Sequence, residues 1–331
     1  MSENGKPKFA MYWAASCGGC EIAVLNIHEK ILDFDANFEV AFWPVAMDAK
    51  YKDVEALEDG EILLTLFNGG IRNDENEHIA KLLRQKSQIM VAFGSCANEG
   101  CIPGLANLSP IESLFETVYN TVSTENEEGI RPQSSFEMPE GTIHIPEMYP
   151  VLRTLDQVID VDYYMPGCPP ESHQVAAVVD LVISVVKGEA VLPPKGTVIG
   201  AGNSTVCDEC ERTRNVKKIK KFVRIQDIER FDPEICLLEQ GLICNGPATL
   251  SGCMAKCPTS GAPCVGCYGP GPRVLDYGAR MVAALASVID SRDPVEIEAI
   301  LDGIVDPAGT FYKFNLAHSL LKTGKASWNG N

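Results

Sequence analysis

The chain has 331 residues, whereas one domain commonly has ~150, so a single small module is excluded. Apolar residues make up 45% and charged residues 22%, which excludes collagen-like and wholly disordered chains. The formal net charge of −17 argues against a broad surface that holds a nucleic-acid backbone.

The first half alternates strand and helix patterns. Runs of apolar and β-forming residues predict five strands, at 9–15, 38–47, 61–67, 89–93 and 161–165. Helical patterns lie between them, at 21–33 and 74–86, and another follows the last strand at 175–186. Strands that alternate with helices pair in parallel, so the pattern predicts an α/β fold with a flavodoxin-like doubly wound sheet. The polar, proline-bearing segment 119–149 is predicted to be a surface insertion.

The composition changes after residue 190. The proline- and glycine-bearing stretch 192–196 suggests a boundary, so we predict one domain at 1–190 and a second at 191–331. From 207 to 267 there is little periodicity but there are eight cysteines, which predicts a small irregular domain organised around something other than an apolar core. Helical patterns return at 274–289 and 295–304 and are expected to pack back on the rest of the chain.

The thirteen cysteines, roughly 4% of residues, are too few for a small disulfide scaffold. Because their number is odd, they cannot all pair within one chain. Residues 1–8 are short and polar, without the apolar region of an export leader, and the apolar stretch 175–186 is too short to span a membrane. We therefore expect a cytoplasmic protein that does not bind a membrane. Its reduced thiols are then free to act as metal ligands or redox groups.

One group of cysteines follows the predicted strands of the first domain. Cys17 and Cys20 come after the first strand, Cys96 after the fourth and Cys168 after the fifth. The carboxyl ends of parallel strands open on one edge of a sheet, so these four thiols can converge. Four thiolates are what a cubane iron–sulfur cluster needs. A Cys-x-x-Cys pair alone also suits a thioredoxin-like redox pair or a zinc site.

The remaining cysteines make two further sets of four and one remainder. The second set is Cys207, Cys210, Cys236 and Cys244, and the third is Cys253, Cys257, Cys264 and Cys267. Zinc ribbons use similar paired motifs, so the spacing leaves the metal open between zinc and iron–sulfur clusters. Cys101, five residues after Cys96, is a fifth thiol where four suffice, and we expect it to pack near the first site.

Several of these motifs are similar to those of one family, the small electron-transferring subunits of nickel–iron hydrogenases. The resemblance covers almost the whole chain and rests on Cys17-Gly18-Gly19-Cys20-Glu21, Gly94-Ser95-Cys96-Ala97, Gly167-Cys168-Pro169-Pro170, and the stretch from Cys236-Leu237 through Cys244-Asn245-Gly246-Pro247 to Cys264-Val265-Gly266-Cys267. It implies that Cys17, Cys20, Cys96 and Cys168 bind a proximal cluster beside the nickel–iron centre of a large subunit.

The chain departs from the respiratory members of that family at two places. Those members begin the distal site with His-x-x-Cys, whereas this chain has Cys207-x-x-Cys210. Their medial cluster has three irons and a proline near the missing corner, whereas Cys257 is available here as a fourth ligand. The resemblance thus implies three 4Fe–4S clusters, the distal one on Cys207, Cys210, Cys236 and Cys244 and the medial one on Cys253, Cys257, Cys264 and Cys267.

All-cysteine ligation lowers a cluster potential relative to imidazole ligation and suits a low-potential partner. With a cytoplasmic location, this resembles the viologen-reducing hydrogenases of methanogens, whose electrons pass through a small iron–sulfur subunit to heterodisulfide reductase. A deazaflavin-reducing hydrogenase shares many of the same motifs. A complex-I-like cluster subunit resembles only the first domain, and a zinc-stabilised scaffold is the alternative without redox chemistry.

Two charged features have open interpretations. Glu21, next to Cys20, either takes part in proton movement near a subunit interface or satisfies N–H groups at a helix start. The run 212–224 has seven basic residues in an acidic chain, beside the predicted distal site. It forms either a docking surface for an acidic redox partner or a solvated helix face.

Overall fold

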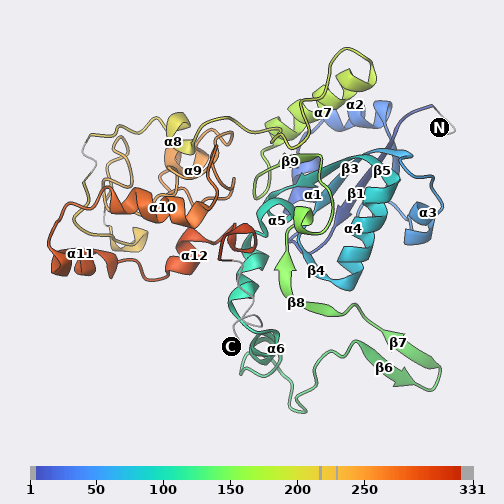
Figure 1. Cartoon of the computed structure of the whole chain (residues 1–331), viewed down its shortest axis with the longest axis horizontal. Coiled ribbons are helices and arrows are strands. Elements are labelled where there is room, and N and C mark those ends of the chain that lie inside the picture. The colour runs from blue at the N-terminus through green and yellow to red at the C-terminus, as the bar shows by residue number, and fades with distance from the viewer. Residues whose placement is uncertain (1–4, 216–217, 229, 322–331) are drawn as a thin grey trace.

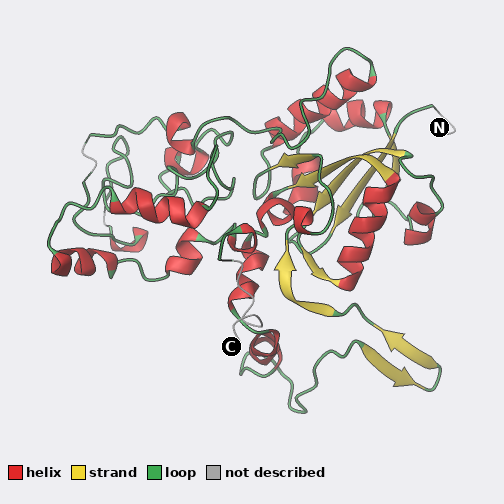
Figure 2. Cartoon of the chain, viewed as in Figure 1, coloured by secondary structure: helices red, strands yellow, loops and turns green. Residues whose placement is uncertain are grey.

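The computed structural model describes residues 5–215, 218–228 and 230–321. Two predictions fall partly outside the described residues. They are the prediction about an export leader, which includes residues 1–4, and the basic run, which includes Lys217. The chain forms a part with a twisted sheet, which includes residues up to about 190, and a part of short helices and loops (Figures 1 and 2). The predicted boundary at residue 190 stays a prediction.

The sheet has five parallel strands in the spatial order β2-β1-β3-β5-β9. Their bounds are β1 Lys8–Trp13, β2 Glu39–Phe42, β3 Ile62–Asn68, β5 Ser87–Phe93 and β9 Tyr163–Met165. Counted along the chain, these five strands have the order 2-1-3-4-5, which is that of the flavodoxin-like doubly wound fold. The predicted fold class is confirmed.

Side chains of β1 alternate between two buried cores, one on each face of the sheet. Phe9 and Met11 pack on the face covered by α2 (Lys30–Asn37) and α7 (Ser172–Val186), while Ala10 and Tyr12 pack on the opposite face. The helices α3 (Tyr51–Glu55) and α4 (Asp74–Lys86) cover that opposite face. This period of two is what a strand buried on both faces requires.

Local signals decide where the predicted elements begin and end. Helix α4 has the predicted bounds, and its start is capped because the Asn73 side chain accepts a hydrogen bond from the Asn76 N–H at 2.7 Å. The predicted helix 21–33 is wrong in extent, since it is split into α1 (Gly19–Leu25) and α2 around His28, whose φ of 56° a continuous helix does not allow. The predicted strand 38–47 ends at Phe42 because residues 43–47 form a turn.

The segment 119–149 extends away from the rest of the molecule (Figure 1). After α6 (Ile111–Tyr119), the strands β6 (Ser135–Met138) and β7 (Gly141–His144) form an antiparallel hairpin whose residues are all exposed. The chain returns through β8 (Met148–Arg153), which pairs with β4 (Ile71–Asn73). The prediction of a surface insertion is confirmed.

The second part has short elements and smaller cores. Its helices are α8 (Val206–Glu209), α9 (Lys256–Thr259), α10 (Tyr277–Ala286), α11 (Pro294–Leu301) and α12 (Pro307–Phe311). The remaining short helices of the chain are α5 (Ser95–Glu99), η1 (Ile102–Leu108), η2 (Leu155–Gln157), η3 (Ile225–Asp227) and η4 (Leu316–His318). The predicted helices 274–289 and 295–304 correspond to α10 and α11. Helix α10 begins later than predicted because Asp276 caps its start, and both helices end earlier, at Ala286 and Leu301.

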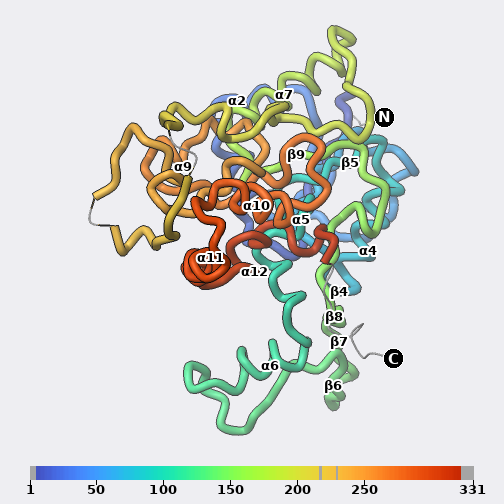
Figure 3. Tube along the Cα trace, turned by 60° about the vertical axis from the view of Figure 1, so that its left-hand side comes forward, coloured from blue at the N-terminus to red at the C-terminus, as the bar shows by residue number. Residues whose placement is uncertain are grey.

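The end of the described chain packs back on the first part, as predicted. The Cys101 N–H donates to the Phe314 carbonyl at 2.9 Å, and the Gln157 amide donates to the Ala317 carbonyl at 2.9 Å. The second part thus lies against the edge of the sheet near α5 and β9 (Figure 3). Among the described residues, no helix has both the length and the apolar character to span a membrane.

Candidate metal centres

The first cysteine group lies at the carboxyl edge of the sheet. Cys17 follows β1, Cys20 lies in α1, Cys96 lies in α5 directly after β5, and Cys168 follows β9. Two backbone hydrogen bonds of 2.8 Å join the loops after β5 and β9, from Gly94 N–H to Met165 and from Ser95 N–H to Gly167. The strand ends therefore bring together thiols that are far apart in sequence.

Gly94 allows close approach within this group. Its φ is 81°, and a Cβ atom there would lie 2.3 Å from the Cys20 Sγ. Only glycine fits, both because the backbone is left-handed and because the thiol takes the space of a side chain. Cys20 and Cys96 are buried, whereas Cys17 is exposed at the molecular surface.

Cys101 is a fifth thiol in contact with the first group. Its side chain is buried, and its Sγ lies 3.5 Å from the Cys168 Sγ. It also packs with Cys96 and with Phe314 from the returning chain. The expectation that Cys101 packs near the first site is confirmed.

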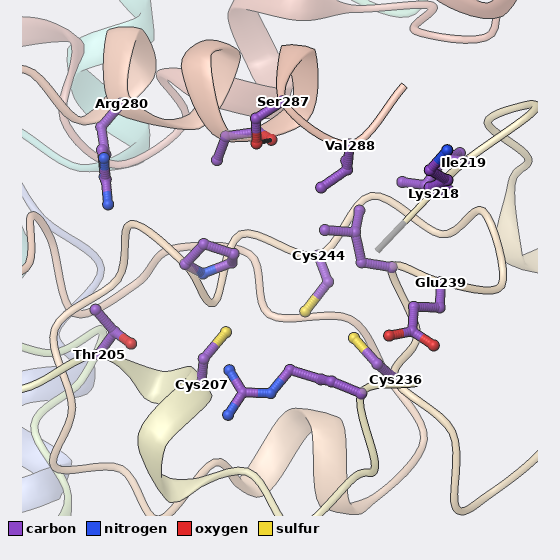
Figure 4. A pocket seen from close by; sticks show the side chains of 14 residues that line it. Thr205, Cys207, Lys218, Ile219, Cys236, Glu239, Cys244, Arg280, Ser287 and Val288 are labelled. Atoms are coloured by element: carbon purple, nitrogen blue, oxygen red, sulfur yellow. Dashed lines mark hydrogen bonds between the residues drawn. The ribbon is translucent and has the colours of Figure 1, made fainter. Parts of the chain in front are cut away.

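The second group surrounds a small cavity lined by all four of its cysteines, Cys207, Cys210, Cys236 and Cys244. An adjoining cavity of about 310 Å³ opens on three of them, and Figure 4 shows the sulfur atoms of Cys207, Cys236 and Cys244 pointing toward one another across it. A Cβ atom on Gly246 would lie 3.0 Å from the Cys207 Sγ and 3.8 Å from the Cys244 Sγ. Gly246 therefore leaves room for both sulfurs.

The third group lines a separate cavity of about 300 Å³ between the two parts of the chain. Its walls include all four cysteines of the third set, Cys253, Cys257, Cys264 and Cys267, together with Cys168 from the first. Tyr268 closes one side, and its hydroxyl accepts a hydrogen bond from the Glu171 N–H at 2.9 Å. The eight later cysteines thus line two cavities, four in each, and their assignment to two clusters stays a prediction.

The three groups adjoin one another. Cys168 lines the cavity of the third group, and its backbone forms a hydrogen bond with the Cys267 thiol, so the third group touches the first. The Cys264 N–H donates to the Cys244 Sγ at 3.3 Å, so the third group also touches the second. The third group therefore lies between the other two, in the order first, third, second.

Burial makes these thiols resist ionisation in the absence of a cation. Burial first, and the Cys244 thiol second, raise the pKa of Cys207 to about 12, while the Arg214 guanidinium opposes the shift. Burial, and then the Cys253 and Cys168 thiols, raise the pKa of Cys267 to about 12. A coordinated metal deprotonates its thiol ligands, so iron bound by these thiols would supply the positive charge that the set lacks. The donor chemistry fits clusters of thiolate-bound iron.

The described residues contain no group of three or more His, Cys, Asp or Glu side chains arranged to hold a single metal ion. The thiols of the second and third groups instead line the walls of the two cavities described above. A cubane cluster binds each of its four thiolates at a different iron.

Glu21 does not cap the start of α1. It is buried, and its Oε2 accepts a hydrogen bond of 2.6 Å from the Trp43 indole N–H. Burial raises the pKa of Glu21 to about 7, and the Trp43 bond opposes the shift. The helix-start interpretation is wrong, because the carboxylate turns to a residue 22 positions away. The sequence carries no signal for this pairing.

The basic run is not helical where it is described. Thr213, Ile219 and Val223 each form an isolated β-bridge with another segment, which holds the backbone extended, so the solvated-helix interpretation is wrong. Arg212 is buried and donates to three carbonyl groups, which gives it a structural role.

Three other cations, Arg214, Lys218 and Arg280, are exposed and line the cavity over the second group. Figure 4 shows Arg280 and Lys218 on opposite sides of this cavity, with Glu239 beside Cys236. Arg280 comes from α10 and was not part of the sequence-based prediction.

Comparison with known proteins agrees with this architecture. The family model of the NADH ubiquinone oxidoreductase 20 Kd subunit matches residues 17–182, which contain the first cysteine group. A [NiFeSe] hydrogenase from Desulfovibrio vulgaris Hildenborough has a similar fold, with a TM-score of 0.51 and 15% identity over 81% of this chain and 95% of that one. The chain thus belongs to the family of the 20 Kd oxidoreductase subunits, and it shares its fold with a hydrogenase subunit.

Two curated relatives define the family more narrowly. The iron–sulfur subunit of the F420-non-reducing hydrogenase of Archaeoglobus profundus is 43% identical over 85% of this chain and 88% of its own length. A subunit of the F420-non-reducing hydrogenase of Methanothermobacter marburgensis is 36% identical over 96% of each chain. The chain belongs to this family of nickel–iron hydrogenase small subunits. Such small subunits pair with a large subunit, which carries the nickel–iron site.

Proposed function

We propose that the chain holds three 4Fe–4S clusters and relays electrons for a cytoplasmic nickel–iron hydrogenase. The first group, Cys17, Cys20, Cys96 and Cys168, holds the proximal cluster. The medial cluster is held by Cys253, Cys257, Cys264 and Cys267, and the distal cluster by Cys207, Cys210, Cys236 and Cys244. Each cluster supplies a site that takes up and releases one electron.

The observation that carries this proposal is the contiguity of the three groups. The Cys168 backbone forms a hydrogen bond with the Cys267 thiol, and the Cys264 N–H donates to the Cys244 sulfur. Electrons from dihydrogen, cleaved on the large subunit, enter at the first group, pass the third and leave at the second. The protein positions these sites and sets their potentials through burial, charge and hydrogen bonds to sulfur.

The exposed position of Cys17 supports entry at the first group. Cys17 lies at the surface of this chain, and Trp13 and Ile22 beside it are large apolar side chains that remain 42% and 55% exposed. Such exposed apolar side chains around a functional thiol suit burial against another subunit. We assign this surface to the large subunit.

The cations over the second group support exit there. Arg214 and Arg280 place positive charge over this cavity in a chain with a net charge of −17, whereas Lys218 is paired with Asp290 at 3.0 Å and Glu239 also lines the cavity. Charged rims steer an oppositely charged partner and fix its register. We propose that an acidic iron–sulfur subunit docks here and passes electrons on to heterodisulfide reductase. The names of the F420-non-reducing relatives favour this acceptor over a deazaflavin.

Anaerobic purification of the complex from its native host tests the proposal. A brown preparation with about twelve irons per chain and a nickel-containing partner is expected. A complex-I-like subunit would lack nickel in its partner, and a zinc scaffold would be colourless and contain zinc. Either result would contradict the proposed function.

A further inference from the structure

One side-chain hydroxyl in the second part is aimed at a predicted cluster ligand. Thr249 is 1% exposed, and its Oγ1 lies 3.4 Å from the Cys264 Sγ. The same oxygen lies 2.7 Å from the Asn245 carbonyl oxygen and 2.8 Å from the Tyr277 hydroxyl. Tyr277 begins α10 and is also buried, so water is excluded from this group of polar atoms.

The proton count depends on whether Cys264 is a thiol or a thiolate. With a thiol, the Cys264 S–H donates to Thr249, and the Thr249 hydroxyl donates to the Asn245 carbonyl. A metal-bound thiolate has no proton, so the Thr249 hydroxyl is free to turn and donate to the sulfur. The Asn245 carbonyl still accepts the Ala248 N–H at 3.2 Å, and therefore loses no obligatory partner.

Tyr277 supports this second arrangement. Its hydroxyl lies 2.8 Å from the Thr249 Oγ1 and 3.4 Å from the Asn245 carbonyl oxygen. When it donates to the nearer Thr249 oxygen, it polarises the Thr249 hydroxyl toward the sulfur. A Cβ atom on Gly266 would lie 2.2 Å from the Tyr277 oxygen, so a glycine is required for this ring to reach the site. Three segments of the second part, which contain Thr249, Gly266 and Tyr277, therefore bring the Thr249 and Tyr277 hydroxyls together.

We propose that Thr249, supported by Tyr277, is a positioning residue that raises the reduction potential of the medial cluster by donating a hydrogen bond to the Cys264 sulfur. This inference rests on the proposed function, in which Cys264 is a medial ligand. The reduced cluster places more negative charge on sulfur than the oxidised cluster does. An O–H···S bond therefore stabilises the reduced state more, and its removal lowers the potential.

The test is a redox titration of the purified hydrogenase complex, followed by electron paramagnetic resonance, with iron measured on each sample. In Thr249→Val, one of the three midpoint potentials should become more negative by up to about 59 mV. For a one-electron couple, this shift is a tenfold change in the reduction equilibrium constant. Thr249→Ser, which keeps the hydroxyl, should leave all three unchanged. Tyr277→Phe should shift the same midpoint in the same direction by less.

Thr65→Val is the matched control. Thr65 is also fully buried, but its hydroxyl pairs with Ser87 inside the sheet. It should leave all three potentials unchanged, although it loses a buried hydrogen bond as Thr249→Val does.

Several outcomes would overturn the inference. One is a Thr249→Val complex with full iron and three unchanged midpoints, and another is a Thr249→Ser complex that shifts as far as the valine variant. If Thr249→Val lost iron, the midpoint potentials of Tyr277→Phe would test the inference in its place. Three unchanged midpoint potentials in Tyr277→Phe would overturn the inference. A wild-type complex with fewer than three iron–sulfur transitions would instead overturn the proposed function itself.

Discussion

The peptide N–H of Cys264 donates a hydrogen bond of 3.3 Å to the sulfur of Cys244. The donor residue belongs to the third cysteine group and the acceptor to the second, so one peptide joins two predicted clusters. Such a bond favours the thiolate form of Cys244, because it places a positive dipole against the sulfur.

The contrast between Cys168 and Cys101 separates ligands from packing residues at the first site. In Cys168→Ala, we expect loss of about four of twelve irons and loss of dihydrogen-dependent dye reduction, because a proximal ligand is removed. Cys101→Ala should keep its iron, although its sulfur lies only 3.5 Å from that of Cys168. Iron analysis and dye reduction on both complexes check this. Full iron and full activity in Cys168→Ala would refute the proximal assignment.

A methyl group on Gly94 should disrupt the same site. In Gly94→Ala, the new Cβ would meet the Cys20 sulfur at 2.3 Å, and the φ of 81° with a ψ of 161° is a conformation almost restricted to glycine, which adds backbone strain of about 1–3 kcal/mol. Gly60→Ala is the control, since Gly60 has a φ of 73° but its nearest neighbour would be 3.9 Å away. We expect both variants to lower the melting temperature and only Gly94→Ala to lose proximal iron. Equal iron in the two would show that close approach at Gly94 is unimportant.

Removal of iron should unfold the second part first. The sheet is held by two extensive apolar cores, whereas one core of the second part is small and includes Cys244 and Cys264 themselves. Metal-organised domains lose their folding free energy with the metal. After anaerobic chelation, limited proteolysis with mass spectrometry should give early cuts within 200–270 and leave the sheet intact. Early cuts within the strands would contradict this.

Elements with strong local signals could be predicted from the sequence. Helix α4 has its predicted bounds because Asn73 caps it and acidic residues occupy its first turn. The break at His28 could not be predicted, because the apolar pattern of 21–33 continues through a residue whose left-handed backbone depends on packing.

The cysteine groups could be predicted for a similar reason. Thiols at the ends of parallel strands must share an edge, so the topology implied the convergence of the first group. The partners of those groups could not be found in this way. Glu21 meets Trp43 and Thr249 meets Tyr277 only through tertiary packing, and neither pair has a spacing that marks it.

The positive charge over the second group should control electron exit. Arg280→Glu reverses a charge that lines the cavity over Cys207 and Cys244, and we expect slower electron transfer to an acidic acceptor and a weaker dependence on salt. Lys187→Glu makes the same charge change at the exposed end of α7, away from that cavity, and should have little effect. The measurement is the rate of dihydrogen-dependent reduction of the native acceptor between low and high ionic strength. Reduction of a small neutral dye should be unchanged in both variants, because a neutral molecule is not steered by charge. If Lys187→Glu slowed transfer as much as Arg280→Glu, only the net charge of the chain would matter, and the docking surface would lie elsewhere.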